Sequence, residues 1–237
     1  MECDTGQSAG CLYVVGTPLG NREDLSPRAA RILTEADLIA CEDTRTSQRI
    51  LQPLGIVTPT IAYHEHNEQR QAIVIADAVQ SGRRIALISD AGMPAISDPG
   101  FRVVRECRRR GLTVIPIPGA TAAMTALAAS GLPSDGFLYL GFLPAKTAAR
   151  KRTFEQYRDF PYTLVFYEST HRIEAFVDDL IEVLGPERTI CIGRELTKMH
   201  ETFYAGTAAI VKERLAKGST KGEFVVMIAK EGYSLEN

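Results

Sequence analysis

Short apolar runs alternate along the chain with longer segments in which apolar residues recur every three or four positions. In the first half, the runs that predict strands are 11–15, 37–41, 60–64, 84–89 and 113–117. The segments whose periodicity predicts helices are 26–36, 47–55, 67–82, 101–111 and 121–131. Such an alternation is typical of a mostly parallel sheet covered by helices, so we expect an α/β fold.

Local signals support these boundaries. Ser26 followed by Pro27 predicts a capped helix start, and Asn67 can cap the helix that follows it. Glycines stand where helices are expected to stop, at Gly55, Gly82, Gly111 and Gly131.

The second half has a different pattern. Strands are predicted at 137–143, 162–168, 189–195, 201–206 and 223–229, and helices at 145–158, 170–185 and 208–218. Two consecutive strands joined by a charged turn near Arg194 and Glu201 indicate an antiparallel or mixed sheet. Turn residues accumulate in GLPSDG, 131–136, which predicts a domain boundary there. We therefore expect two α/β lobes, 1–131 and 132–237, with a ligand cleft between them.

Composition limits the class of protein. With 237 residues, 45% of them hydrophobic, the chain can build a substantial core. No apolar run approaches the roughly 20 residues that cross a bilayer, and residues 1–10 lack signal-peptide features. We expect a cytoplasmic protein in which residues 1–10 form a flexible lead-in. The cysteines are odd in number and form no CxxC pair, which favours reduced, buried thiols at Cys3, Cys11, Cys41, Cys107 and Cys191.

The net charge of −2 gives no overall attraction to nucleic acid, so any polyanion site has to come from local clusters. One basic cluster comprises Arg102, Arg105, Arg108, Arg109 and Arg110. The other comprises Lys146, Arg150, Lys151, Arg152 and Arg158. Each cluster can contact phosphates or can be an ordinary solvated helix face.

Loops with small, turn-forming residues follow predicted strands at 16–21, 42–46, 88–100 and 118–122. In a parallel sheet these strand ends share one edge, where ligands bind. The chain has no GxGxxG, Gly-Lys or GxSxG sequence, which weakens the dinucleotide, nucleoside triphosphate and serine hydrolase alternatives. His64 and His66 lack an evident third ligand nearby, so no metal site is expected.

The loop ISDAGMPAISDPG, 88–100, has almost no bulky side chain, so backbone groups can approach a ligand closely. Asp90 and Asp98 within it suit a cationic ligand better than a phosphate. S-adenosylmethionine fits this description, because it carries a sulfonium and an ammonium and needs no phosphate cradle. The residues alone leave other ligands open.

A series of motifs runs through 11–228: VVGTPLGN, LSPRA, CEDTR, SDAGMPAISDPG, PIPGATA, SGLPSDGF, FYESTHRI, RELTKMHE and KGEFV. In this order they resemble the rRNA small subunit methyltransferase I family of the tetrapyrrole methylase superfamily. The resemblance implies two α/β domains with S-adenosylmethionine between them, a homodimer, and 2′-O-methylation of a cytidine ribose in the decoding region of 16S rRNA.

The resemblance also assigns residues to the cofactor. The implied contacts are Pro18, Leu19, Asp90, Gly92, Met93, Ile96, Thr121, Ala122, Tyr167, Leu196 and Phe224. Asp90 and Asp98 are further expected to brace their loop through Asx-type hydrogen bonds.

For catalysis we hypothesise that Glu195 or Lys198 takes the hydroxyl proton. Arg194 and Arg172 are expected to bind phosphates, and Glu168 to lie in the same cleft. The EDTR loop, 42–45, is expected to meet the target nucleotide. The residues predicted to contact RNA are Asp43, Arg45, Arg150, Lys151, Arg152 and Arg172. The alternative for each is a structural ion-pair network at the strand ends.

The family usually continues into a small helical tail, whereas this chain stops soon after 223–229. If such a tail helps to bind RNA, this chain is expected to bind the cofactor well and RNA poorly. Other functions stay open: a sister methyltransferase acting on a tetrapyrrole or a protein side chain, and a non-catalytic RNA-binding assembly factor. A nucleotide-phosphate hydrolase is a further alternative, but Asp90 and Asp98 supply only a weak metal-binding cluster for it.

Overall fold

The computed structural model describes residues 10–236, so Cys3 and residues 1–9 of the predicted lead-in lie outside the described part. The chain divides into two compact units, Met1–Thr121 and Ala122–Asn237. The division therefore falls before helix α5 (Ala122–Ala129), whereas the sequence analysis placed the boundary after it. The physical reason is that α5 packs against strands of the second unit.

The sheet of the first unit contains five parallel strands in the order β3-β2-β4-β1-β5. The strands are β1 (Cys11–Val15), β2 (Leu38–Cys41), β3 (Thr60–Ala62), β4 (Arg84–Ile88) and β5 (Thr113–Ile117). The predicted parallel sheet is confirmed. Pro116 has no N–H to donate, and β5 tolerates it because this strand lies at an edge of the sheet.

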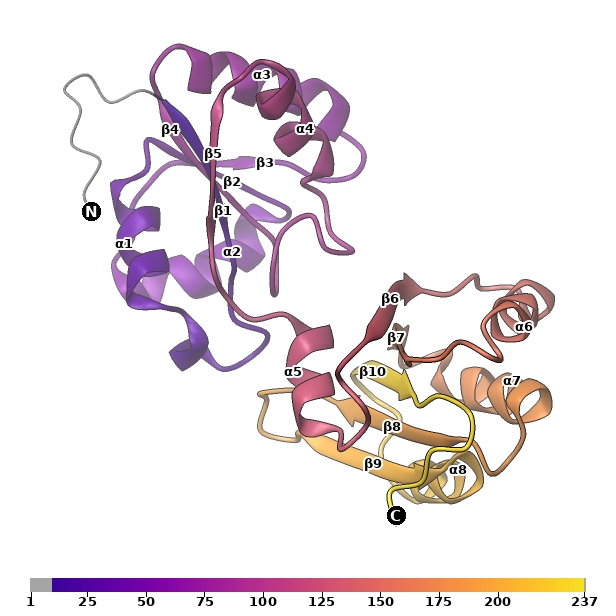
Figure 1. The fold of residues 1–237 in the computed structure, drawn as a ribbon. Helices are drawn as coiled ribbons and strands as arrows, with labels where there is room; N and C mark the ends of the chain where they lie inside the picture. The colour runs from indigo at the N-terminus through magenta and orange to yellow at the C-terminus, as the bar shows by residue number, and fades with distance from the viewer. Residues whose placement is uncertain (1–9, 237) are drawn as a thin grey trace. The chain divides into compact units, whose positions relative to one another are not determined.

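Helices cover both faces of this sheet, as Figure 1 shows. They are α1 (Pro27–Glu35), α2 (Thr44–Leu51), α3 (Glu68–Gln80) and α4 (Phe101–Arg109), with 3-10 turns η1 (Arg22–Asp24) and η2 (Gln52–Leu54). Ile39 of β2 belongs to the apolar cluster under α1 and α2, whereas its neighbour Ala40 belongs to the cluster under α3 and α4. Alternate residues of a strand point to opposite faces, so each strand contributes to two cores.

The helix starts follow the sequence with two differences. Ser26 caps α1 as predicted, since its Oγ accepts the Ala29 N–H at 3.0 Å. Asn67 precedes α3 but does not cap it, because its Oδ1 accepts the His64 N–H at 2.9 Å. Helix α2 begins earlier than predicted, since Asp43 provides its N-cap. The glycines predicted to end helices, Gly55, Gly82, Gly111 and Gly131, all have positive φ.

The second unit has a mixed sheet of five strands in the order β6-β7-β10-β8-β9, in which only β6 and β7 pair in parallel. The strands are β6 (Phe137–Phe142), β7 (Thr163–Ser169), β8 (Thr189–Arg194), β9 (Thr202–Thr207) and β10 (Glu223–Ile228). The remaining helices are α6 (Thr147–Gln156), α7 (Ile173–Leu184) and α8 (Ala208–Lys217). Phe166 of β7 packs in the core beneath α6, α7 and α8. Its neighbour Tyr167 contacts α5, which therefore covers the opposite face.

The buried thiols Cys11, Cys41, Cys107 and Cys191 are free, as predicted. Within residues 10–236, no helix combines the length and apolar character of a membrane span. The same residues contain no group of three or more His, Cys, Asp or Glu side chains that could hold a metal ion.

Candidate functional site

The strand order of the first unit creates a switch point at β1, which lies between β4 and β5. The chain continues from β1 to α1 on one face of the sheet and from β4 to α4 on the other. Loops that leave neighbouring strands toward opposite faces border a crevice, and ligands of open α/β sheets bind there. The candidate site of this unit is therefore the edge formed by the loops 16–21, 89–100 and 118–121.

Backbone hydrogen bonds join the loops after β1 and β4. The Thr17 N–H donates to Gly92 O at 2.8 Å, and the Gly92 N–H donates to Thr17 O at 3.1 Å. The buried Thr17 hydroxyl also donates to Ser89 O at 3.2 Å. A Cβ on Gly92 would lie 3.3 Å from Leu19 Cδ2, so the two loops are in close contact. Pro18 beside them is buried.

The loops after β1 and β5 approach each other through two glycines. A Cβ on Gly119 would lie 2.7 Å from Gly16 Cα, and a Cβ on Gly16 would lie 2.7 Å from Gly119 Cα. Any larger residue at either position would push the loops apart. The edge therefore presents backbone groups with few side chains. Thr121 and Ala122, both partly buried, end this loop and begin α5.

The loop 89–100 is held in a strained conformation. Ala95 and Ser97 have φ of 69° and 62°, a region that costs residues with a Cβ about 1–2 kcal/mol each. Ile96 between them is 45% exposed, whereas Met93 packs partly against the core beneath α3 and α4. Strain of this kind is concentrated at ligand sites, where the surrounding structure maintains it. Of these two predicted cofactor contacts, Ile96 is the more open to a ligand.

Carboxylates gather at the same edge. The Asp43 N–H donates to Asp90 Oδ1 at 3.3 Å, so Asp90 braces the neighbouring segment after β2. Hydrogen bonds from Arg45 hold the pKa of Asp43 below its usual range. Burial, followed by the charge of Asp90, raises the pKa of Glu42. Burial also raises the pKa of Asp90, although the hydrogen bond from Asp43 opposes that shift.

In the second unit, opposite charges fix the turn between β8 and β9. Lys198 Nζ lies 3.0 Å from Glu195 Oε1 and 2.8 Å from Glu223 Oε2. Burial alone would raise the pKa of Glu195, but hydrogen bonds from the Glu223 N–H and Lys198 outweigh it and lower the pKa. Burial alone would lower the pKa of Lys198, but its two carboxylate partners raise it. The two residues hypothesised as proton acceptors are therefore engaged with each other and with Glu223.

Arg194 also helps to fix the turn between β8 and β9. It is 8% exposed, and its guanidinium donates to Lys221 O at 2.7 Å and to His200 O at 3.1 Å. These bonds occupy the side chain that the sequence analysis assigned to a phosphate. Leu196 is 6% exposed and packs over Gly193, where a Cβ would lie 3.0 Å from Leu196 Cδ2.

Glu168 of β7 and the partly buried Arg172 form an ion pair. Glu168 Oε1 accepts the Ser169 N–H at 2.8 Å, and Oε2 lies 3.1 Å from an Arg172 terminal nitrogen. Arg172 also donates to Leu143 O at 2.6 Å. The Glu168 side chain is 0% exposed and that of Arg172 is 26% exposed, and neither Glu168 Oε2 nor Arg172 Nε has a hydrogen-bond partner among residues 10–236.

The two aromatic residues assigned to the cofactor lie on opposite faces of the second sheet. Tyr167 Oη accepts the Ala123 N–H at 3.1 Å on the α5 face, where Tyr139 and Phe142 pack against its ring. Phe224 is 2% exposed in the core beneath α6, α7 and α8. The alternation of β10 turns the Phe224 ring into the core, so any ligand contact in the stretch around Phe224 has to come from its backbone or its neighbours.

The basic cluster on α6 is mostly paired within the protein. Arg150, predicted as an RNA contact, is 2% exposed and donates to Asp179 Oδ2 from both Nε and a terminal nitrogen, so its guanidinium is engaged within the protein. Lys151 pairs with Asp179 and Glu182. Arg152 is exposed and has no side-chain partner among residues 10–236.

The arginines of α4 are similarly occupied. Arg102 pairs with Glu68, while Arg109 and Arg110 both pair with Glu106, whose pKa their hydrogen bonds lower to about 2. The first basic cluster therefore carries less free positive charge than its sequence indicates.

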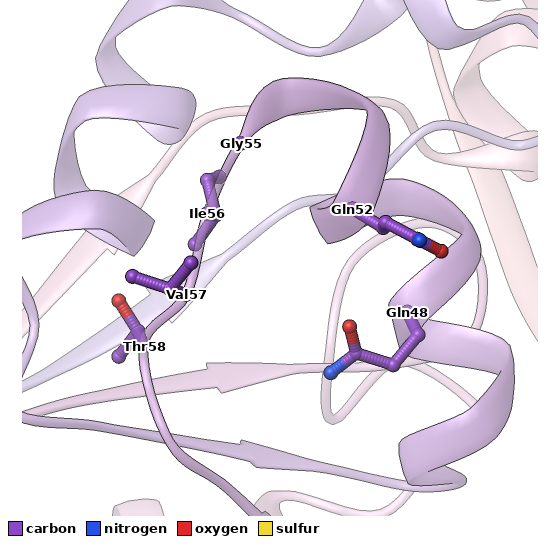
Figure 2. Close-up of a pocket in the computed structure, with 6 residues that line it drawn as sticks. All are labelled: Gln48, Gln52, Gly55, Ile56, Val57 and Thr58. Atoms are coloured by element: carbon purple, nitrogen blue, oxygen red, sulfur yellow. The ribbon is translucent and has the colours of Figure 1, made fainter.

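A surface hollow lies elsewhere on the first unit, as Figure 2 shows. It is lined by Gln48, Gln52, Gly55, Ile56, Val57 and Thr58. Residues 55–58 lead into the amino end of β3, so in a parallel sheet this hollow belongs to the edge opposite the cofactor loops. The Thr58 hydroxyl donates to Leu33 O at 2.7 Å, which gives it a structural role.

Sequence reasoning missed three contributors. Thr17 and Gly119 join the loops, and both lie in motifs from which neighbouring residues were chosen. Glu42 begins the CEDTR segment, but only Asp43 and Arg45 were selected there. Its position directly after an apolar strand was the signal that could have identified it.

Comparisons with a family model and with named proteins both find methyltransferases. The family described as Tetrapyrrole (Corrin/Porphyrin) Methylases matches residues 11–211. A Haemophilus influenzae protein named Ribosomal RNA small subunit methyltransferase I is 49% identical over 221 residues, covering 92% of this chain and 78% of that protein. A protein of the same name from Escherichia coli O157:H7 is 46% identical over 233 residues, covering 97% of this chain and 80% of that protein.

Solved structures share the fold at lower identity. A diphthine synthase has a TM-score of 0.71 at 15% identity, covering 92% of this chain and 90% of that chain. A uroporphyrin-III C-methyltransferase from Thermus thermophilus, solved in complex with S-adenosyl homocysteine, has a TM-score of 0.64 at 19% identity, covering 93% and 97%.

Proposed function

The chain belongs to the tetrapyrrole methylase family, and we propose that it transfers a methyl group from S-adenosylmethionine to the 2′-oxygen of a cytidine ribose in 16S rRNA. The observation that carries the proposal is the near-half identity, over more than nine-tenths of the chain, to proteins named Ribosomal RNA small subunit methyltransferase I. The cytidine and the 2′-oxygen come from the sequence resemblance and are the finer part of the proposal.

The residues at the edge of the first sheet fit the cofactor. Gly16, Gly92 and Gly119 leave backbone groups uncovered, while the loops they belong to are joined tightly. Leu19 and Ile96 offer apolar side chains at the same edge, and Asp90 adds negative charge that suits a cation. When bound, S-adenosylmethionine supplies an electrophilic methyl group on a positively charged sulfur.

The protein's own contribution to such a transfer is positioning and proton removal. Backbone hydrogen bonds already fix these loops, so they lose little conformational entropy when a ligand binds. This favours alignment of the reacting groups. A neutral ribose hydroxyl is a weak nucleophile, so a nearby base adds to the rate. The strained, fixed loop 89–100 is consistent with the first requirement.

RNA contacts are proposed for cations that the protein leaves unpaired. Lys146 and Arg152 on and before α6 are exposed and have no side-chain partner within residues 10–236. Arg45 is 90% exposed, although it pairs with Asp43. Phosphate contacts of this kind position an RNA without reading its sequence. A homodimer is also proposed, and sedimentation at twice the 26.0 kDa chain mass tests it.

The test is a methylation assay on small ribosomal subunits purified from cells that lack the corresponding methyltransferase. The protein is incubated with these subunits and methyl-labelled S-adenosylmethionine, and the 16S rRNA is then digested for mass spectrometry. A labelled 2′-O-methylcytidine is the expected product. Label on a base, on a ribosomal protein or on added tetrapyrrole would contradict the proposed acceptor, and no measurable donor affinity by calorimetry would contradict the proposed cofactor.

A further inference from the structure

Glu42 lies at the edge that carries the proposed cofactor loops. It directly follows β2, which pairs with β4 in the sheet. The hydrogen bond from the Asp43 N–H to Asp90 Oδ1, 3.3 Å long, joins the segment after β2 to the loop after β4. Glu42 is therefore attached, through its neighbour in sequence, to the loop 89–100.

The carboxylate of Glu42 does not stabilise the fold through a hydrogen bond or an ion pair within residues 10–236. Neither of its oxygens accepts a hydrogen bond from any residue in 10–236, and it forms no ion pair there. Asp43 beside it caps α2 and pairs with Arg45. Glu195 and Glu168, the other acidic candidates, are bound by Lys198 and Arg172. Of Glu42, Glu168 and Glu195, Glu42 is the one without an ion pair among residues 10–236, whereas Glu168 Oε2 is buried beside Arg172 without a hydrogen bond.

Charged groups from three strand ends surround Glu42. They are Asp43 next to it, Asp90 after β4, and His64 and Glu65 after β3. Burial is the largest cause of the raised pKa of Glu42, and the charge of Asp90 comes second, while His64 acts in the opposite direction. A carboxylate with a raised pKa binds a proton more strongly than an ordinary glutamate does.

We propose that Glu42 is the general base that takes the proton from the ribose hydroxyl. This inference rests on the proposed function, because it needs a hydroxyl nucleophile. The O–H bond breaks and its proton moves to a Glu42 oxygen, while an oxygen lone pair forms the new bond to the methyl carbon. The carbon–sulfur bond breaks and its electron pair stays on sulfur, so the sulfonium becomes a neutral thioether. Asp90 is a positioning residue, whose charge maintains the basicity of Glu42.

The first test compares Glu42→Gln with Glu213→Gln, an exposed glutamate of α8 that is not among the charged groups around Glu42. Single-turnover methylation of saturating small subunits should fall by about 100-fold or more in Glu42→Gln, the usual contribution of a general base. Glu213→Gln should keep the wild-type rate. Calorimetry should give S-adenosylmethionine affinities within about threefold of each other for all three proteins, since the base acts on the hydroxyl.

A second readout does not depend on activity. In ¹³C NMR of the unliganded protein, one glutamate carboxyl should titrate above the usual glutamate pKa of about 4.3, and this signal should be absent from Glu42→Gln. Asp90→Asn removes a negative charge, so the same titration should move to lower pH. The acid limb of the pH–rate profile should move with it. A purely structural role for Asp90 would lower the rate without moving that limb.

The outcomes separate the two proposals. Wild-type protein that binds S-adenosylmethionine but labels no ribose would overturn the proposed function. Wild-type protein that labels ribose while Glu42→Gln retains more than about a third of its rate would overturn the role of Glu42. If Glu42→Gln does not fold by circular dichroism, the NMR titration of Asp90→Asn decides: an unmoved glutamate signal excludes the coupling on which the proposal depends.

Discussion

Replacement of Arg150 by methionine tests whether this arginine serves the fold or the substrate. Arg150 is 2% exposed, and the Asp179 side chain that it meets is 9% exposed. Its Nε donates to Asp179 Oδ2 at 2.7 Å, and its terminal nitrogens also reach Ala145 O and Ala175 O. Arg150→Met keeps most of the apolar stem but leaves the Asp179 carboxylate buried without its main partner.

Breaking a buried ion pair on one side costs about 3–5 kcal/mol. Lys151 Nζ still lies 3.6 Å from Asp179 Oδ1 and offsets part of the loss. We therefore expect Arg150→Met to lower the free energy of unfolding of the second unit by about 3 kcal/mol, near the lower end of that range. Adding Asp179→Leu removes the orphaned charge, and the double variant should recover most of this loss.

The chain has no tryptophan, so urea denaturation is followed by far-UV circular dichroism, with amide hydrogen exchange to separate the units. Amides of α6 and α7 should lose protection in Arg150→Met, whereas amides of the first unit should not. Lys151→Met is the matched control. Its side chain is 27% exposed and pairs chiefly with the exposed Glu182, so the expected cost is only about 0–1 kcal/mol.

Two results would refute this reasoning. One is a loss in Arg150→Met no greater than in Lys151→Met. The other is an RNA affinity that falls more than about threefold in folded Arg150→Met while its stability is unchanged, since loss of one phosphate contact costs that much or more. The second result would restore Arg150 to the RNA contacts assigned from the sequence.

Three further predictions follow from the loops and the exposed charges. Gly119→Ala places a Cβ 2.7 Å from Gly16 Cα and should therefore weaken S-adenosylmethionine binding at least tenfold, as measured by calorimetry. Gly55→Ala is the control, because there is open space around its Cβ, and it should leave this affinity unchanged. Replacing Lys146 and Arg152 by alanine should weaken RNA binding and reduce the slope of log affinity against log salt by about 0.7–0.9 per lost phosphate contact; an unchanged slope would exclude both residues. Glu195→Gln should lower the free energy of unfolding by about 1.5–3 kcal/mol at neutral pH. Because the folded-state pKa of Glu195 is lowered, its contribution is present above about pH 4.3 and is lost as the pH falls through the folded-state value, so denaturation curves of variant and wild type should converge in acid.

The sequence predicted the elements well because their signals are local. The alternation around Ile39 and Ala40 and the cap at Ser26 depend on a few neighbouring residues, and the structure has them as expected. The surroundings of charged side chains could not be predicted in the same way, because they depend on partners far along the chain. Asp179 is distant in sequence from Arg150, and nothing in the run KTAARKR indicates that one of its cations is buried. Hydrophobic periodicity predicts where a helix lies, but it does not show which of the helix's cationic side chains pairs with a buried carboxylate.

Backbone strain separates the motifs of this chain from ordinary turns. Among residues 10–236, the non-glycine residues with positive φ are Ala95, Ser97, Glu195 and Thr197, and they occur as two pairs in two motif loops. A loop that only connected two elements would be expected to carry glycine or asparagine at these positions, since either relieves the strain at little cost. At about 1–2 kcal/mol each, such strain persists only where the surrounding contacts fix the loop. Those contacts are present: Gly92 and Thr17 fasten one loop, and Glu195, Lys198 and Glu223 fasten the other. The charges of Glu195, Lys198 and Glu223 are paired with one another, so these residues fix the conformation of the second loop.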